Sequence, residues 1–162
     1  MIVIRKEKAC CFTGHRVIAS IHREDMPALL EKQIRCRIQE GICDFITGGA
    51  RGFDTLAAEA VLHLREEFPH IRLILAIPCP DQTQGWPLDE KIRYEEIALK
   101  ADETCLISKT YTKTCMMRRN RFMADNSIGC IFYLTQMRSG TYKTVEYAME
   151  QGSKLYNILS EE

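Results

Sequence analysis

The chain has 162 residues, of which 46% are hydrophobic and 27% are charged, as in an ordinary soluble globular protein. Its 22 Lys and Arg residues balance 22 Asp and Glu residues, which argues against a protein that coats nucleic acid or an anionic membrane through its overall charge. A local basic patch is not excluded. We expect one domain over residues 1–162 and, because no long apolar segment is present, a cytoplasmic protein.

Short apolar runs alternate along the chain with longer segments whose apolar residues recur at helical spacing. The first long segment ends at Gly41 and the second ends before Pro69, as helices do. In chain order we expect a strand over 9–13, a helix over 24–40, a strand over 44–47, a helix over 54–68, a strand over 71–77, a helix over 88–101, a strand over 103–108, a helix over 114–126, a strand over 129–134, a helix over 141–151 and a strand over 154–158.

This alternation predicts an α/β fold, with a Rossmann-like, doubly wound, mostly parallel sheet and helices on both faces. The strand segments are continuous apolar runs, which is typical of strands buried on both sides. In such sheets, ligands bind beyond the carboxyl ends of the strands, near the point where the strand order reverses. We therefore expect the loops that follow the strands to carry the chemistry.

The loop after the second strand gives the strongest functional signal. Its Gly48, Gly49 and Gly52 allow close backbone approach and expose amides at a helix N-terminus, an arrangement that attracts phosphate. Arg51 suits the same anion, and Asp54 either caps the helix or binds a ribose hydroxyl. The loop matches neither the Walker A motif nor the dinucleotide fingerprint. The alternative is a tight turn that only allows close helix packing.

The first strand is followed by Gly14, His15 and Arg16, which we expect at the same rim. A single histidine is either a hydrogen-bonded structural residue or a ligand contact, and the neighbouring arginine favours an anion site. Trp86 is the only tryptophan and lies in a loop, where it is suited to stack on a base or cover a pocket. Tyr94 is expected to face the same way, and a core position is the alternative for Trp86.

After the fifth strand, Ser139, Gly140 and Thr141 open a helix and offer two hydroxyls and a flexible turn. They either contact a ligand or simply cap the helix. One turn of the preceding helix holds three arginines, which usually marks a solvated basic face. Its apolar neighbours indicate that one arginine is drawn inward, so Arg119 and Asn120 join the candidate ligand contacts.

The chain contains eight cysteines, but none forms a C-x-x-C pair, and the core is large enough to need no disulfides. We expect reduced thiols that serve as small apolar residues. The four histidines do not cluster with the cysteines at metal-ligand spacing, so no metal site is expected.

Six motifs together resemble one family. They are Thr13-Gly14-His15-Arg16, Gly48-Gly49-Ala50-Arg51-Gly52-Phe53-Asp54, Ile77-Pro78, Trp86, Arg119-Asn120-x-x-Met123-x-Asp125 and Gly140-Thr141. The chain resembles the YpsA-like branch of the SLOG superfamily, which also holds DprA recombination mediators and LOG proteins. The resemblance implies a Rossmann-like fold, a nucleotide or nucleotide-derived ligand, and a sensing or regulatory role.

The resemblance to LOG proteins implies a candidate reaction, since these proteins hydrolyse nucleoside monophosphates. They use an arginine of a Met-x-x-Arg element and a glutamate of Gly-Gly-x-Gly-Thr-x-x-Glu. Met116-x-x-Arg119 fits the first element, but Thr144 stands where the glutamate belongs and Glu146 falls two residues later. A glycosidic hydrolase needs a carboxylate near the bond that it cleaves. Of the candidate catalytic residues, Arg119 and Asp54, only Asp54 carries one, so hydrolysis by this route is in doubt.

The leading hypothesis is a module that binds a small phosphorylated nucleotide or an ADP-ribose-like ligand, without a further cofactor, and signals to a protein partner. The alternatives are a nucleotide N-glycosidic hydrolase and a DprA-like single-stranded DNA-binding protein. Net neutrality weighs against DNA, because backbone binding needs several Lys or Arg along a groove. No membrane partner is expected, and assembly of identical chains is an open alternative.

Overall fold

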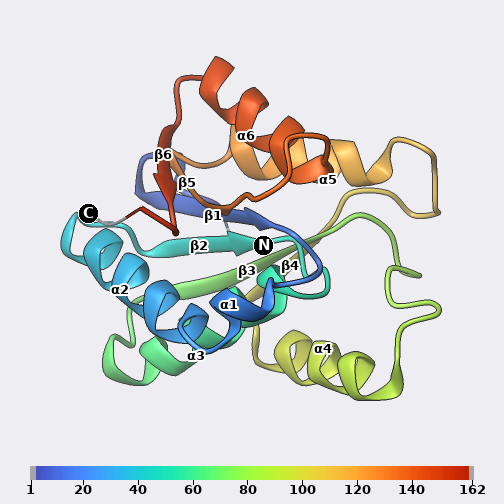
Figure 1. Ribbon diagram of the computed structural model, residues 1–162, viewed down its shortest axis with the longest axis horizontal. Helices are drawn as coiled ribbons and strands as arrows, with labels where there is room; N and C mark the ends of the chain where they lie inside the picture. The colour runs from blue at the N-terminus through green and yellow to red at the C-terminus, as the bar shows by residue number, and fades with distance from the viewer. Residues whose placement is uncertain (1–2, 161–162) are drawn as a thin grey trace.

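A six-stranded parallel sheet forms the centre of the computed structural model, which describes residues 3–160 (Figure 1). The strands are β1 (Ala9–Gly14), β2 (Asp44–Thr47), β3 (Arg72–Ile77), β4 (Glu103–Leu106), β5 (Gly129–Tyr133) and β6 (Lys154–Asn157). Their order is β4-β3-β2-β1-β5-β6, and each neighbouring pair is parallel. The chain winds outward from β1 to β4 and then returns to β5 on the other side of β1. The strand order therefore reverses between β1 and β5, where such folds bind ligands.

Helices cover both faces of the sheet (Figure 1). They are η1 (Lys6–Lys8), α1 (Ser20–Arg23), α2 (Met26–Gln39), α3 (Phe53–Glu67), α4 (Leu88–Lys100), α5 (Cys115–Asp125) and α6 (Gly140–Glu150). On one face α2, α3 and α4 contribute Leu30, Phe53 and Ile97 to the core, whereas α5 and α6 contribute Met123 and Ala148 on the other. The predicted doubly wound α/β fold is confirmed. None of the described helices is long and apolar enough to cross a membrane.

The predicted elements are confirmed with small shifts at their ends. The helix expected over 24–40 begins at Met26, because Asp25 occupies the N-cap position and a proline lies in the first turn. The short elements η1 and α1 were not predicted, since three or four residues carry no apolar periodicity. Burial on both sides is confirmed for the central strands but was wrong for β4 and β6, which are partly exposed at the sheet edges.

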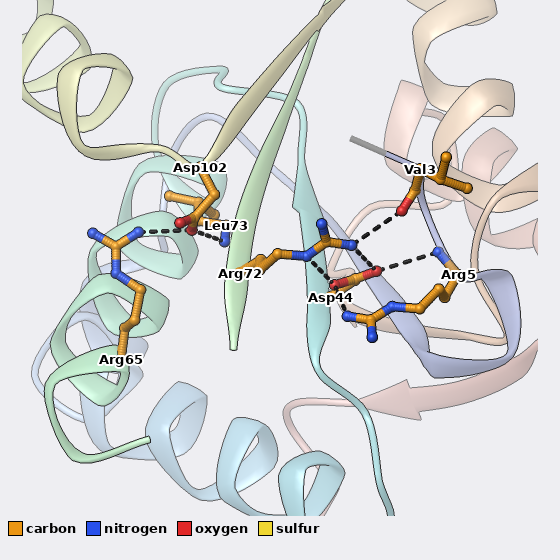
Figure 2. Close-up of polar contacts among 7 residues, drawn as sticks. All are labelled: Val3, Arg5, Asp44, Arg65, Arg72, Leu73 and Asp102. Atoms are coloured by element: carbon orange, nitrogen blue, oxygen red, sulfur yellow. Dashed lines mark hydrogen bonds and ion pairs between the residues drawn. The ribbon is translucent and has the colours of Figure 1, made fainter. Parts of the chain in front are cut away.

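An ionic cluster closes the amino end of the sheet (Figure 2). Asp44, fully buried at the start of β2, accepts two hydrogen bonds of 2.7 Å from the Arg72 guanidinium. It accepts two more of 3.2 Å from the backbone amide and guanidinium of Arg5. Burial alone would raise the pKa of Asp44, but the bonds from Arg72 and Arg5 lower it. Beside it, the Asp102 carboxylate accepts a hydrogen bond from the Leu73 amide at 2.7 Å. Charged side chains of the protein itself thus bind the polar groups at this edge.

The cysteines fit the expected role of small apolar residues. All eight are free thiols, and six of them are buried. Cys11 and Cys130 are direct neighbours on β1 and β5, inside the sheet. Within residues 3–160, no group of three or more His, Cys, Asp or Glu side chains is arranged to hold a metal ion.

Candidate functional site

The loops after β1 and β2 are joined at the carboxyl edge of the sheet. The Phe53 amide, at the start of α3, donates to the His15 carbonyl at 3.1 Å. Gly52 has a φ of +76°, and a Cβ on it would lie 2.0 Å from the Arg16 carbonyl oxygen, so only glycine permits this approach. A Cβ on Gly14 would lie 2.4 Å from the Phe53 ring. Packing thus gives a sufficient reason for both glycines, and their contact with a ligand stays a prediction.

Arg119 is the arginine that the helix draws inward, with only 5% of its surface exposed. From α5 its Nη1 donates to the Gly48 carbonyl at 2.6 Å and to the Gln82 Oε1 at 3.1 Å. Its Nε donates to the Asn120 Oδ1 at 2.9 Å. Burial lowers the pKa of Arg119, while the nearby Asp54 raises it. The guanidinium therefore fixes the glycine loop, and a direct contact with a ligand stays a prediction.

Two buried charges flank Gly48. A Cβ on this glycine would lie 2.7 Å from the Arg119 Nη1 and 2.9 Å from the Asp54 Oδ2. Asp54 does not cap α3, whose N-cap is Gly52; its Oδ2 instead accepts the Ala50 amide at 3.3 Å. The other oxygen, Oδ1, is buried without a hydrogen-bond partner. Burial raises the pKa of Asp54 to about 6, although Arg119 and the Ala50 and Gly48 amides lower it.

Because the pKa of Asp54 is raised, we expect this residue to contribute more to the free energy of unfolding as the pH falls. Between the ordinary value of 3.8 and about 6, the folded chain keeps a proton that the unfolded chain has released. The free energy of unfolding therefore falls as pH rises through this interval. From about pH 7 down to about pH 4.5, wild type should gain about 2 kcal/mol relative to Asp54→Asn. Urea unfolding of both proteins measures this gain, and parallel pH profiles would contradict it.

His15 has a structural partner in the loop after β5. Its Nε2 accepts the Thr135 amide at 2.9 Å, and its ring lies edge-on to Tyr133, with 5.6 Å between centroids. Burial lowers the pKa of His15, which favours the neutral ring that this bond requires. The Tyr133 hydroxyl accepts the Ala19 amide at 3.0 Å and lies 2.9 Å from the His22 Nδ1. These contacts support the interpretation of His15 as a hydrogen-bonded structural residue. They also connect the loop after β1 to β5 and the loop that follows it.

A cavity of about 400 Å³ opens beside the loops after β1, β2 and β3. Arg51 forms an ion pair with Glu90 on α4, and Trp86 lies edge-on to Tyr94, with 5.7 Å between ring centroids. Arg16, Arg51 and Trp86, three of the predicted site residues, thus come together here, and we name this space the Trp86 cavity. Its wall includes Arg16, Arg51, Gln82, Trp86, Tyr111 and Met116.

Other predicted site residues lie elsewhere. Asn120 and Gly140 line a separate cavity of about 700 Å³ between α5 and α6. The Ser139 hydroxyl accepts a hydrogen bond from the Tyr142 amide at 3.1 Å. Ser139 thus caps α6, which was the alternative to a ligand contact. Thr141 is buried in the first turn of the same helix. Of the predicted residues, Arg16, Arg51 and Trp86 therefore line the Trp86 cavity, whereas Asn120 and Gly140 line the other.

Gln82 is a site residue that the sequence did not indicate. It is buried, and its Nε2 donates to the Gly49 carbonyl at 3.4 Å while its Oε1 accepts from Arg119. Gly49 has a φ of +66°, and a Cβ there would lie 3.0 Å from Ile77 and 3.3 Å from Gln82. The only available signal was position, because Gln82 directly follows the loop after the third predicted strand. Glu90, on α4, gave no signal at all.

A parallel, doubly wound sheet with arginine-bearing loops around a cavity at its carboxyl edge defines a Rossmann-like α/β protein with a ligand-sized site. The model of the YspA SLOG family, named YpsA, matches residues 12–159. The chain belongs to this family, and the resemblance inferred from its motifs is confirmed.

Individual relatives agree with this assignment. The chain is 28% identical over 165 residues to the UPF0398 protein YpsA of Bacillus subtilis strain 168, covering 93% of this chain and 92% of that protein. It is 29% identical over 150 residues to the uncharacterized SPbeta prophage-derived protein YoqJ of the same strain, covering 84% and 86%. DNA processing protein A (DprA) of Streptococcus pneumoniae superposes with a TM-score of 0.66 at 21% identity, over 95% of this chain. The chain spans 50% of that DprA, and the likeness is one of fold.

Proposed function

We propose that this protein binds a small nucleotide, or a phosphorylated nucleotide-derived ligand, and acts as a sensor or regulatory module that reports to a protein partner. The Trp86 cavity is the observation that carries the proposal, because Arg16 and Arg51 lie there beside Trp86 and Tyr111. Guanidinium groups bind phosphate, and aromatic rings stack on bases. A volume of about 400 Å³ lies within the range of about 300–1,000 Å³ that ligand pockets span.

Arg16 is the guanidinium best placed to receive a phosphate. Its side chain is exposed and forms no hydrogen bond or ion pair within residues 3–160, whereas Arg51 is paired with Glu90. No side chain caps the N-terminus of α3, so its backbone dipole adds positive potential on the same side of the sheet. These features support an anion at the junction of the first two loops.

The alternatives have weaker support. Thr144, at the position of the LOG glutamate, donates its hydroxyl to the Gly140 carbonyl at 2.9 Å inside α6, so that route to hydrolysis lacks its carboxylate. A DNA-binding protein would have to use the arginines of α5 and the loop after β5, but one of these four, Arg119, is buried and hydrogen-bonded to the Gly48 carbonyl. The remaining three are Arg118, Arg121 and Arg138.

Thermal unfolding with a panel of nucleoside monophosphates, nucleoside diphosphates and ADP-ribose tests the proposal. A true ligand at a hundredfold excess over its Kd should add about 3 kcal/mol and raise the Tm by about 6–10 °C. Arg16→Gln should weaken binding about tenfold, since a hydrogen bond to a charged group is lost. Arg138→Gln, an exposed arginine outside the cavity wall, should bind as wild type does. A panel without any shift would overturn the proposal.

Two further measurements detect the alternatives. Release of free base from a nucleoside monophosphate would identify a hydrolase, and its loss in Asp54→Asn would assign the carboxylate. Salt-sensitive retention of a labelled single-stranded oligonucleotide would identify a DNA-binding protein. Either result, in the absence of a thermal shift with nucleotides, replaces the proposed function.

A further inference from the structure

A second cavity, of about 380 Å³, adjoins the Trp86 cavity. The two share Arg16 and Arg51 in their walls, so these two side chains separate them. The second wall adds Arg23 from α1, and Arg93 and Glu90 from α4. We name this space the arginine cavity after its four guanidinium groups.

The charges on this wall are unbalanced. Arg51 pairs with Glu90, the only carboxylate on the wall. Arg93 pairs at 2.5 Å with Glu59, which lies outside the wall. The remaining two arginines pair with no carboxylate within residues 3–160. Two of the four guanidinium groups on the wall, those of Arg16 and Arg23, thus carry positive charge that no described carboxylate balances, and such a local excess attracts an anion.

Hydrogen bonds to backbone carbonyls hold Arg23 and the turn that carries Arg51 in place. The Arg23 Nε donates to the Ile18 carbonyl at 3.1 Å, which folds this side chain over its own loop. The Thr55 hydroxyl donates to the Ala50 carbonyl at 3.0 Å, which holds the turn that carries Arg51. A site whose groups are already in position loses less conformational entropy when a ligand binds. Arg23 and the turn that carries Arg51 are therefore already held in position without a ligand.

We propose that the arginine cavity binds a second phosphate group, so that the ligand is a nucleotide with a diphosphate. The inference rests on the proposed function, which places the base and the first phosphate in the Trp86 cavity. Because Arg16 and Arg51 belong to both walls, one diphosphate can contact them while it passes from one cavity to the other. Glu90 holds Arg51 in the absence of ligand, and a phosphate displaces this carboxylate because it offers more charge and more acceptor oxygens.

Calorimetric titration with AMP, ADP, GMP and GDP tests the inference. For whichever base binds, the diphosphate should bind about tenfold more tightly than the monophosphate. Arg23→Gln should remove this advantage and leave the affinity for the monophosphate unchanged. Glu90→Gln should raise the affinity for the diphosphate several-fold, because no carboxylate then competes for Arg51. Arg65→Gln, at the far end of α3, is the control and should behave as wild type does.

The outcomes distinguish this inference from the proposed function. Equal affinities of wild type for ADP and AMP, and for GDP and GMP, would overturn the second phosphate site while the nucleotide site stands. A preserved diphosphate advantage in both Arg23→Gln and Arg93→Gln would overturn the placement in the arginine cavity. Absence of binding by all four nucleotides would overturn both proposals. Loss of the advantage in Arg23→Gln together with its increase in Glu90→Gln supports the inference.

Discussion

Gly52→Ala is expected to destabilise the folded chain by about 3 kcal/mol or more, since backbone strain and a steric clash act together. The residue has φ +76° and ψ −117°, a conformation open to glycine and strained for alanine. The added Cβ would also lie 2.0 Å from the Arg16 carbonyl oxygen and 2.4 Å from its carbon. Both atoms belong to the backbone, so relief requires the two loops to separate. Urea unfolding followed by circular dichroism measures the loss.

Gly85→Ala and Gly152→Ala are the matched controls for this prediction. Their φ values, +83° and +82°, are close to that of Gly52, but a Cβ at either position meets nothing within 4 Å. Each should lower the free energy of unfolding by about 1 kcal/mol, because only the strain of a positive φ acts on the alanine. If Gly52→Ala costs no more than these controls, the close approach of the first two loops is not the constraint described here. If it costs more, the excess reports the contact with the Arg16 backbone together with the strain of ψ −117° at Gly52.

Arg119→Met is expected to cost about 3–5 kcal/mol, the loss typical of a buried charge deprived of its partner. The methionine fills much of the space but donates no hydrogen bond. The Gly48 carbonyl and the Gln82 Oε1 then lose their donor, and the buried carboxylate of Asp54 loses its nearest described positive charge. The chemical-denaturation midpoint reports the loss, and the pKa of Asp54 should rise further.

Arg118→Met is the control, because this neighbour on α5 is exposed, and it should change stability by under about 0.5 kcal/mol. A double mutant provides the sharper test. Asp54→Asn removes the carboxylate that Arg119 compensates, so the two substitutions together should cost less than the sum of their separate losses by about 1–3 kcal/mol. Additive losses would show that the two buried charges do not interact.

Most of the fold was predictable because burial leaves a strong imprint on the sequence. Apolar runs such as that of β3 indicated strands, and Gly41 and Pro69 marked the ends of helices. The elements that escaped prediction, η1 and α1, are too short for periodicity, whereas β6 was predicted as a strand and only its burial was wrong. At an edge, hydrogen bonding to one neighbour maintains a strand whose side chains remain partly exposed.

The location of the candidate site residues was predictable from the sequence, but their ion pairs were not. The rule that ligands bind beyond the carboxyl ends of parallel strands correctly brought Arg16 and Arg51 to one cavity. Nothing local revealed that Arg51 pairs with Glu90, 39 residues away, because ion pairs between distant segments depend on tertiary packing. The same holds for Arg23 and Arg93, which look like ordinary surface arginines in the sequence. Whether the predicted residues contact a ligand stays a prediction.

The ionic cluster at the amino edge of the sheet can be altered independently of the cavities at the carboxyl edge. The amino edge is closed by Asp44 and the two arginines that bond to it, whereas both cavities open at the loops of the carboxyl edge. Substitutions more than about 7–10 Å apart that share no partners usually have additive effects. Substitutions that strengthen the amino edge should therefore raise the free energy of unfolding without changing the arrangement of Arg16 and Glu90 at the carboxyl edge.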